Sequence, residues 1–144
     1  MAMRDGERVV ITGLGIVAAT GIGLEPFWDK LLKGTSAIRH ITLCDVTGLD
    51  SQIAGEVPDF DPRQFIEPPN AARHLTRTTQ LAVAAARLAV ADAGLTREDL
   101  ADDPPVRVVI GVSMGGFDFI EREIRRQCHH GLASLRPSVI GCVN

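Results

Sequence analysis

The chain has 144 residues, of which 45% are hydrophobic and 23% charged, and its formal net charge is -3. This length allows one domain with a single core, and the composition is that of a globular protein, which argues against a disordered chain. The small net charge gives no bias toward nucleic acid or anionic membranes. No apolar stretch approaches the roughly 18 residues that a membrane span needs, and the N-terminus has no apolar run typical of a signal peptide. We therefore expect a soluble, cytoplasmic protein without nucleic-acid or membrane partners.

The residue types that bind metals are few and scattered. Cys44, Cys128 and Cys142 form an odd number at irregular spacing, which matches neither a disulfide framework nor a metal-ligand pattern. They predict reduced thiols, as in the cytoplasm. His129 and His130 are adjacent, so on a helix their side chains point about 100° apart, and no cysteine or carboxylate stands at ligand spacing. No metal site is expected.

The N-terminal region begins with a predicted strand over residues 8–12, because an apolar, β-branched run that ends at a glycine is typical of a strand covered on both faces. Residues 16–23 are expected to form a loop. A helix then begins near Leu24 and ends at Gly34, since apolar residues recur at helical spacing. Trp28 lies on that apolar stripe, and we expect it to pack in the core.

The middle of the chain, residues 35–70, is expected to be mostly irregular. Residues 38–46 and 53–57 are candidates for short extended pieces. Four prolines stand between Pro58 and Pro69, which excludes regular structure there. Long stretches of this kind in a compact domain tend to be functional or to form an interface.

The second half of the chain contains the clearest predicted helix, over residues 77–93, with an apolar face and seven alanines that permit close packing. Residues 96–99 resemble a capping box for one more helical turn. Residues 106–112 predict a second buried strand, and a helix follows from about Phe117 to Gln127.

The order of these elements predicts an α/β layered fold with largely parallel strands, because strands alternate with helices. Only two convincing central strands are present, at residues 8–12 and 106–112. A sheet of this kind normally has about five strands. The core therefore looks incomplete, and we expect that more polypeptide is needed to finish it.

A glycine-rich segment follows the first predicted strand. Residues 13–18 match the pattern G-x-G-x-x-A of dinucleotide-binding loops. That function requires a helix that starts at the second glycine, so that its amide groups face a pyrophosphate. Here the next helix is predicted only near Leu24, which disfavours this interpretation. A nucleotide-binding α/β domain, tested by NAD binding, remains an alternative.

The same segment and several others are similar to one known family. The blocks occur in the family's order, from Val9 to about Ile140, and each is moderately specific on its own. They are residues 9–17 (VVITGLGIV), 28–38 (WDKLLKGTSAI), 53–57 (IAGEV), 60–62 (FDP), 91–95 (ADAGL) and 110–116 (IGVSMGG). Together they resemble the N-terminal part of a β-ketoacyl-(acyl-carrier-protein) synthase, closest to the type II condensing enzymes of bacterial fatty acid and polyketide synthesis.

The resemblance implies a thiolase-like layered α/β/α fold, of which residues 1–144 form the N-terminal portion. It implies an acyltransferase that performs decarboxylative Claisen condensation, with a cysteine thiolate as nucleophile and two histidines that assist decarboxylation. It implies no cofactor. The family's nucleophile and histidines fall downstream of this sequence, so we expect no catalytic residue in this chain and no activity from the chain alone. Cys142 lacks the family's small-residue motif and is expected to be an inert thiol.

The resemblance also implies two candidate sites. Ser113 and Met114 align with the far end of the acyl pocket, where an adaptable methionine would help to set chain length; core filling is the alternative role of Met114. Arg73, His74 and Arg77 match a basic stretch that contacts the acidic acyl carrier protein in relatives. A solvated helix start is the alternative for these three residues.

A second basic cluster, formed by Arg125, Arg126 and Arg136, is a further candidate for contact with the carrier protein. Glu121 and Arg125 stand at i, i+4 on a predicted helix, a spacing that favours an exposed ion pair worth a few tenths of a kcal/mol.

Three functional hypotheses remain open at this point. The first is a condensing enzyme of which this chain is one portion, either a fragment or a true half, acting on acyl or malonyl thioesters of the acyl carrier protein as a homo- or heterodimer. The second is a catalytically silent dimer partner, like the chain-length factors of aromatic polyketide systems. The third is the NAD(P)-binding α/β domain.

Overall fold

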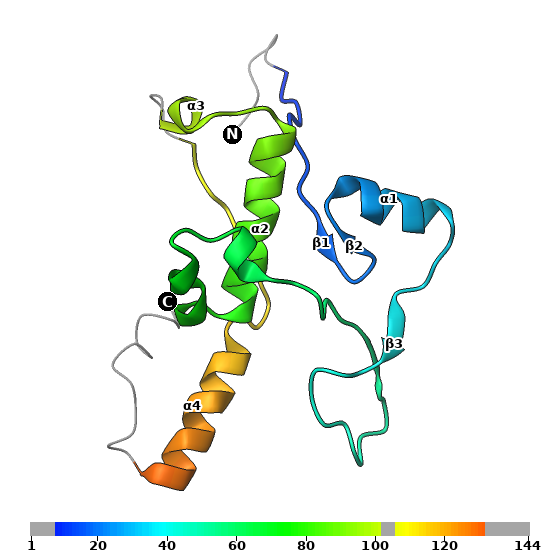
Figure 1. Cartoon of the computed structure of the whole chain (residues 1–144), viewed down its shortest axis with the longest axis vertical. Helices are drawn as coiled ribbons and strands as arrows, with labels where there is room; N and C mark the ends of the chain where they lie inside the picture. Colours follow the sequence, from blue (N-terminus) through cyan, green and yellow to red (C-terminus); the bar gives the residue numbers. More distant parts are fainter. Residues whose placement is uncertain (1–7, 102–105, 132–144) are drawn as a thin grey trace.

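The chain is a mixed α/β structure arranged around one long helix, α2 (Figure 1). The computed structural model describes residues 8–101 and 106–131. In chain order the elements are β1 (Val17–Ala18), β2 (Gly21–Ile22), α1 (Leu24–Leu32), β3 (Ile38–His40), β4 (Ile53–Gly55), the 3-10 helices η1 (Pro62–Gln64) and η2 (Pro69–His74), α2 (Arg77–Asp92), α3 (Arg97–Ala101) and α4 (Phe117–His130). No helix within the described ranges is long and apolar enough to cross a membrane.

Helix α2 is fixed at its start by a side-chain cap and near its end by the N-terminal segment. The hydroxyl of Thr76 accepts a hydrogen bond from the amide of Thr79 at 3.2 Å, which satisfies one of the amide groups left free in the first turn. The amide of Leu14 donates to Oδ2 of Asp92 at 2.9 Å, so the extended N-terminal segment is tied to the last turn of α2. Figure 1 shows this segment running beside the helix.

The contact between the N-terminal segment and α2 requires glycine at two positions. A Cβ atom at Gly15 would overlap the backbone of Ala85 and Ala89, and one at Gly13 would overlap Ala89 and Ala93. The glycines remove side-chain bulk from the segment, and the alanines keep the helix surface small. The predicted close packing of the alanine-rich helix is therefore confirmed.

Two short antiparallel pairs make up the strands. β1 pairs with β2, with Val17 opposite Ile22, so the prediction of a loop over residues 16–23 is wrong: a tight hairpin forms there. β3 pairs with β4, with Ile38 opposite Gly55. The extended pieces predicted around these positions are thus confirmed, although the strands are shorter than the predicted ranges.

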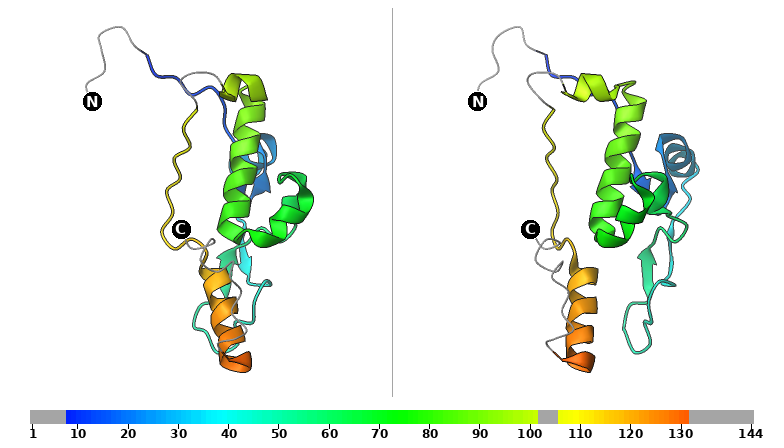
Figure 2. Two further views of the ribbon diagram at one scale, coloured as in Figure 1. Left: turned by 90° about the vertical axis from the view of Figure 1, so that its left-hand side faces the viewer. Right: turned by 60° about the vertical axis from the view of Figure 1, so that its left-hand side comes forward.

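The two predicted central strands are extended but unpaired. Residues 8–12 and 106–112 belong to no strand pair within the described part of the chain, and Val9 is 84% and Val109 92% exposed. Figure 2 shows the second segment running by itself past α2 toward α4. The predicted burial is therefore wrong for this chain by itself, because an isolated extended segment has no neighbouring strand to cover its side chains and pair its backbone.

The predicted layered, parallel sheet is likewise not formed by the described residues, in which both strand pairs are two-stranded and antiparallel. A parallel sheet needs the two extended segments and further strands side by side, and residues 8–101 and 106–131 do not supply those neighbours. The buried apolar residues come largely from irregular segments instead. They are Ala37, Val46, Phe60, Ile66, Ala72 and Ala84.

The side-chain bonds predicted for the last two helices are present. The amide of Thr96 donates to Oδ2 of Asp99 at 2.6 Å and the amide of Asp99 donates to the hydroxyl of Thr96 at 3.3 Å, which confirms the capping box before α3. On α4, Arg125 donates to Glu121 at 2.7 Å. Both side chains of this ion pair are exposed, so its contribution to stability is small.

Glu56 organises the loop that follows β3. Its carboxylate accepts hydrogen bonds from the amides of Leu43, at 3.0 Å, and Thr42, at 2.8 Å, and these bonds hold the pKa of Glu56 below its ordinary value of 4.5. A carboxyl group whose pKa is lowered by folding contributes stability above its unfolded pKa. That stability is lost as the pH falls through the folded pKa.

We therefore expect Glu56→Gln to reduce the hydrogen-exchange protection of the Thr42 and Leu43 amides near neutral pH. In the unmodified chain the same protection should fall only below pH 4.5. Glu25→Gln, at an exposed position on α1, is the control and should leave both amides unchanged. NMR measurement of the two protection factors checks this, and equal protection in Glu56→Gln and in the unmodified chain would contradict it.

Candidate functional site

The predicted carrier-binding residues lie where η2 meets α2. Arg73 and His74 end η2 and are exposed, and Nε of Arg73 donates to Nε2 of His74 at 3.0 Å. Arg77 begins α2 and is half-buried: Nη2 donates to the carbonyl of Val57 at 2.7 Å, and the guanidinium lies 4.6 Å from the centre of the Phe60 ring. Two of the three residues are therefore presented to solvent, while the third is committed to contacts within the chain.

A groove of about 330 Å³ opens beside these residues. Arg63 of η1 and Arg73 of η2 both line it, together with Gln80 of α2. Asp61 holds Arg63 through two hydrogen bonds, Nε to Oδ1 and Nη2 to Oδ2, each of 2.9 Å. Sequence reasoning missed Arg63. The order Asp61-Pro62-Arg63, which places an N-cap residue two positions before an arginine, is the signal that could have found it.

Ser113 and Met114, the predicted acyl-pocket residues, lie in the turn between residues 106–112 and α4. Both are exposed, Met114 to 65%. The turn is connected to α2 by a long hydrogen bond of 3.5 Å from the amide of Gly116 to the hydroxyl of Thr78. Met114 is thus not core filler here, and its pocket role stays a prediction.

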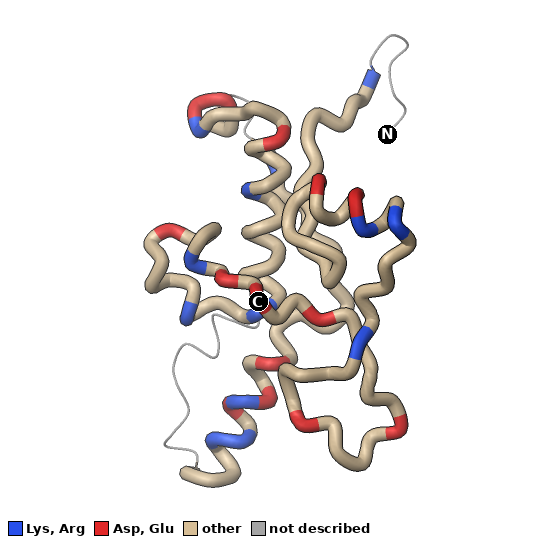
Figure 3. Tube along the Cα trace, turned by 45° about the vertical axis from the view of Figure 1, so that its right-hand side comes forward, with Lys and Arg blue, Asp and Glu red and all other residues tan. Residues whose placement is uncertain are grey.

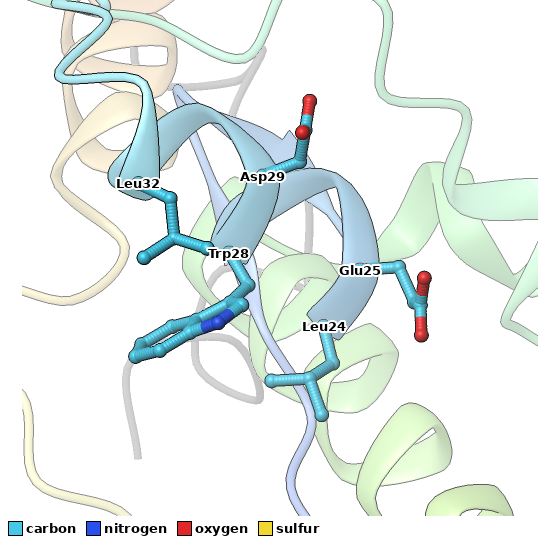
Figure 4. A pocket seen from close by; sticks show the side chains of 5 residues that line it. All are labelled: Leu24, Glu25, Trp28, Asp29 and Leu32. Carbon is cyan, nitrogen blue, oxygen red and sulfur yellow. The ribbon is translucent and has the colours of Figure 1, made fainter.

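Helix α1 carries an exposed apolar face. Figure 4 shows Leu24, Trp28 and Leu32 on one side of the helix, with Glu25 and Asp29 pointing away from them. These residues line an open hollow of about 470 Å³. All of them come from one helix, so among the described residues the hollow has no opposing wall and no converging polar groups of the kind a ligand site has. Trp28 is 53% exposed, and its predicted core role is wrong for this chain, because no other described element lines that face.

The cysteines of the described region are not arranged for nucleophilic catalysis. Cys44 and Cys128 are exposed, and within the described residues neither forms a hydrogen bond with a histidine or a carboxylate that could activate it. Across residues 8–101 and 106–131, no group of three or more His, Cys, Asp or Glu could hold a metal ion. Cys142 lies outside the described residues.

The second basic cluster is not a uniform positive surface. Arg125 is paired with Glu121, and Nη1 of Arg126 lies 3.8 Å from the buried carboxylate of Glu123. Figure 3 shows basic and acidic residues interspersed along α4. Arg136 lies outside the described residues, so the cluster stays a prediction.

The glycine segment does not have the geometry of a dinucleotide site. The β1–β2 hairpin follows Gly15, and α1 begins only at Leu24, so α1 does not start at the second glycine as a dinucleotide-binding loop requires. Both glycines serve the contact with α2 instead. The structure thus gives no support to the nucleotide-binding alternative.

These observations define a class. It is an α/β chain with two unpaired extended segments, residues 8–12 and 106–112, and an exposed apolar face on α1. Exposed basic residues at the end of η2, Arg73 and His74, form a basic edge beside α2. Residues 6–142 match the family model described as the N-terminal domain of β-ketoacyl synthase. The chain belongs to the β-ketoacyl synthase family.

Individual relatives agree with this assignment. The chain is 40% identical over 135 residues to polyketide β-ketoacyl synthase 2 of Streptomyces halstedii. The aligned residues make up 94% of this chain and 32% of that protein. It is 36% identical over 136 residues to 3-oxoacyl-(acyl-carrier-protein) synthase 2 of Coxiella burnetii, again covering 94% and 32%. Its structure is similar to the ishigamide ketosynthase/chain length factor, with a TM-score of 0.81 and 34% identity over 94% of this chain and 33% of that one. The chain thus spans about a third of the length of these relatives.

Proposed function

We propose that this chain supplies the N-terminal part of a β-ketoacyl-(acyl-carrier-protein) synthase, an acyltransferase of fatty acid or polyketide synthesis with a thiolase-like layered fold. Family membership over residues 6–142 supports the class of reaction. The observation that carries the proposal is the exposure of residues 8–12 and 106–112, in a chain that matches a third of a solved ketosynthase/chain length factor chain with a TM-score of 0.81.

The two exposed segments would be strands of a larger sheet in such a synthase. The remaining two thirds of the synthase would supply the neighbouring strands and would also cover the apolar face of α1. Burying one valine, leucine or isoleucine side chain contributes about 1.5–3 kcal/mol, and residues 106–112 alone include five exposed aliphatic side chains. They are Val106, Val108, Val109, Ile110 and Val112. Completing the sheet therefore has a large driving force.

The chemistry would be decarboxylative Claisen condensation. A cysteine thiolate takes the acyl group from a carrier-protein thioester, and the carbanion formed from a malonyl thioester attacks that acyl-enzyme. We assign the thiolate and its two histidines to the two thirds of the relatives' length that this chain does not cover. In the completed site Ser113 and Met114 would close the far end of the acyl pocket, where the flexible thioether of methionine suits chains of variable length.

The carrier protein would bind at the basic edge. Arg73 and His74 are exposed at the end of η2, and a guanidinium group forms strong, directed hydrogen bonds with the carboxylates of an acidic partner. The name of the Coxiella burnetii relative includes the acyl carrier protein, which supports a carrier protein as the partner.

A second candidate function is a silent partner of an active ketosynthase. The solved relative is named as a ketosynthase/chain length factor, which favours a heterodimer with one chain of each kind. The residue at the nucleophile position distinguishes the two functions: a cysteine there would make the complete protein an enzyme, and a replacement would make it a partner.

A chimera tests the proposal. This chain would replace the matching N-terminal third of the Coxiella burnetii synthase, and condensation of acyl- and malonyl-carrier-protein would be followed by mass spectrometry of the products. The chimera should form β-ketoacyl product, and the chain alone should form none. Replacing the host's nucleophilic cysteine by alanine in the chimera is the control for background activity.

A chimera that folds cooperatively and dimerises but forms no product would contradict the proposed function. Stoichiometric acylation of Cys142 in the chain alone would contradict the assignment of the nucleophile to other polypeptide.

A further inference from the structure

The groove between η1, η2 and α2 has two arginines from different segments of the chain at its lining. Arg63 lies in η1, within the segment of residues 57–66, and Arg73 lies at the end of η2. Each is exposed to solvent, and the groove has a volume of about 330 Å³. Two guanidinium groups beside one groove are suited to a partner that presents carboxylates.

Asp61 fixes the direction of Arg63. Its carboxylate bonds Nε and Nη2 of the guanidinium at 2.9 Å each, and it also accepts the backbone amide of Arg63 at 3.0 Å as the cap of η1. Hydrogen bonds from Arg63 hold the pKa of Asp61 below its ordinary value, so the pair stays charged near neutral pH. Within the described residues Nη1 of Arg63 makes no hydrogen bond and is available to a partner.

Arg77 has a different environment. It is half-buried at the start of α2, donates to the carbonyl of Val57 at 2.7 Å and lies over the ring of Phe60 at 4.6 Å. Phe60 is itself buried and stacks on Phe65 with ring centres 5.8 Å apart. One guanidinium thus holds residues 57–66 against α2 through a carbonyl and an aromatic ring.

We infer that Arg63 and Arg73 are the two cationic contacts of the carrier-protein docking groove, and that Arg77 is a positioning residue that holds the Arg63 segment in register with Arg73. This inference rests on the proposed carrier-protein function. It differs from the set of residues that the family resemblance predicts, because it adds Arg63 to the docking surface and removes Arg77 from it. The partner would bring the carboxylates of an acidic carrier-protein helix into the groove.

The first arm of the test is binding of an acyl carrier protein to the 144-residue chain, measured by calorimetry at low and at physiological salt. Arg63→Ala and Arg73→Ala should each weaken binding about five-fold at low salt, and by less at higher salt, because rim charges are screened. Arg97→Ala, at an exposed position on α3, is the matched control and should change nothing.

The second arm separates positioning from contact. Arg77→Ala should raise hydrogen exchange at the amides of Gln64, Phe65 and Ile66, in η1 and directly after it, which donate to the carbonyls of Asp61 and Pro62. Arg77→Lys should restore part of the protection, since a lysine can still reach the Val57 carbonyl. If Arg77 acts through Arg63, the double variant Arg63→Ala/Arg77→Ala should bind the carrier no more weakly than Arg63→Ala alone.

The inference is overturned by several results. Arg63→Ala with unchanged affinity would remove Arg63 from the docking surface. Arg77→Ala that weakens binding as much as Arg73→Ala, with unchanged exchange in η1, would make Arg77 a direct contact. If the unmodified chain binds no carrier protein, the proposed partner is wrong, and so is the docking role of Arg63 and Arg73. The exchange measurement still decides in that case whether Arg77 holds η1.

Discussion

Gly15→Val is expected to lower the free energy of unfolding of the chain by about 3 kcal/mol, or to prevent folding altogether. The reason is steric: even a Cβ at this position would overlap the backbone of Ala85 and Ala89, and helix backbone cannot move aside locally. The segment would have to leave α2, which would also break the hydrogen bond between Leu14 and Asp92. Urea unfolding followed by circular dichroism at helical wavelengths measures the change.

Gly111→Val is the matched control, since in the described structure a Cβ at that position would meet no atom within 4 Å beyond Gly111 and its two chain neighbours. Its urea midpoint should stay close to that of the unmodified chain. If Gly15→Val unfolds at the same midpoint as the control, the contact between the N-terminal segment and α2 does not stabilise the chain.

The sequence contains the information for this contact, but in a form that local patterns do not show. Two residues of extended chain cover about 6.6–6.8 Å, and four residues of helix cover about 6 Å. Gly13 and Gly15 therefore match alanines spaced four apart, Ala93, Ala89 and Ala85, in antiparallel register. A motif search stops at the two glycines and suggests a phosphate loop, because it does not compare them with a distant helix.

Helices α1 to α4 could be predicted because their signals are local. Apolar residues at helical spacing, an alanine-rich stretch and a capping box each act within a few residues of chain. Strand pairing and burial depend instead on neighbouring segments, which a local sequence pattern does not identify. Residues 8–12 and 106–112 have the composition of buried strands, and Trp28 that of a core residue, yet within the described structure nothing covers them.

The candidate site shows the same limit at the level of single residues. The family resemblance predicts Arg73, His74 and Arg77 as one basic stretch. In the structure these residues have different environments. Arg77 contacts the carbonyl of Val57 and the ring of Phe60. Arg63, from a separate segment of the chain, lines the groove beside Arg73. Charge can be read from the sequence, but the direction of a charged side chain requires the packing around it.

Phe60→Ala is the second substitution with a large expected effect. Phe60 is 6% exposed, stacks on Phe65 and carries the guanidinium of Arg77, so truncation would leave a cavity and remove both ring contacts. Removing a buried phenylalanine side chain typically costs about 3–5 kcal/mol, and a value near 3 kcal/mol is expected here, because the surrounding segment is irregular and can partly collapse. Urea unfolding measures this loss.

Phe117→Ala is the control, because Phe117 is 57% exposed and its truncation removes little buried surface. Phe60→Leu separates volume from aromatic character: it should recover most of the unfolding free energy but not the cation–π contact, and the η1 amides should then exchange faster than in the unmodified chain. Equal stability of Phe60→Ala and Phe117→Ala would contradict the picture of residues 57–66 as a packed segment. The wall of the groove that Arg63 lines would then not depend on Phe60, which is, with the Val57 carbonyl, one of the two contacts through which Arg77 holds that segment on α2.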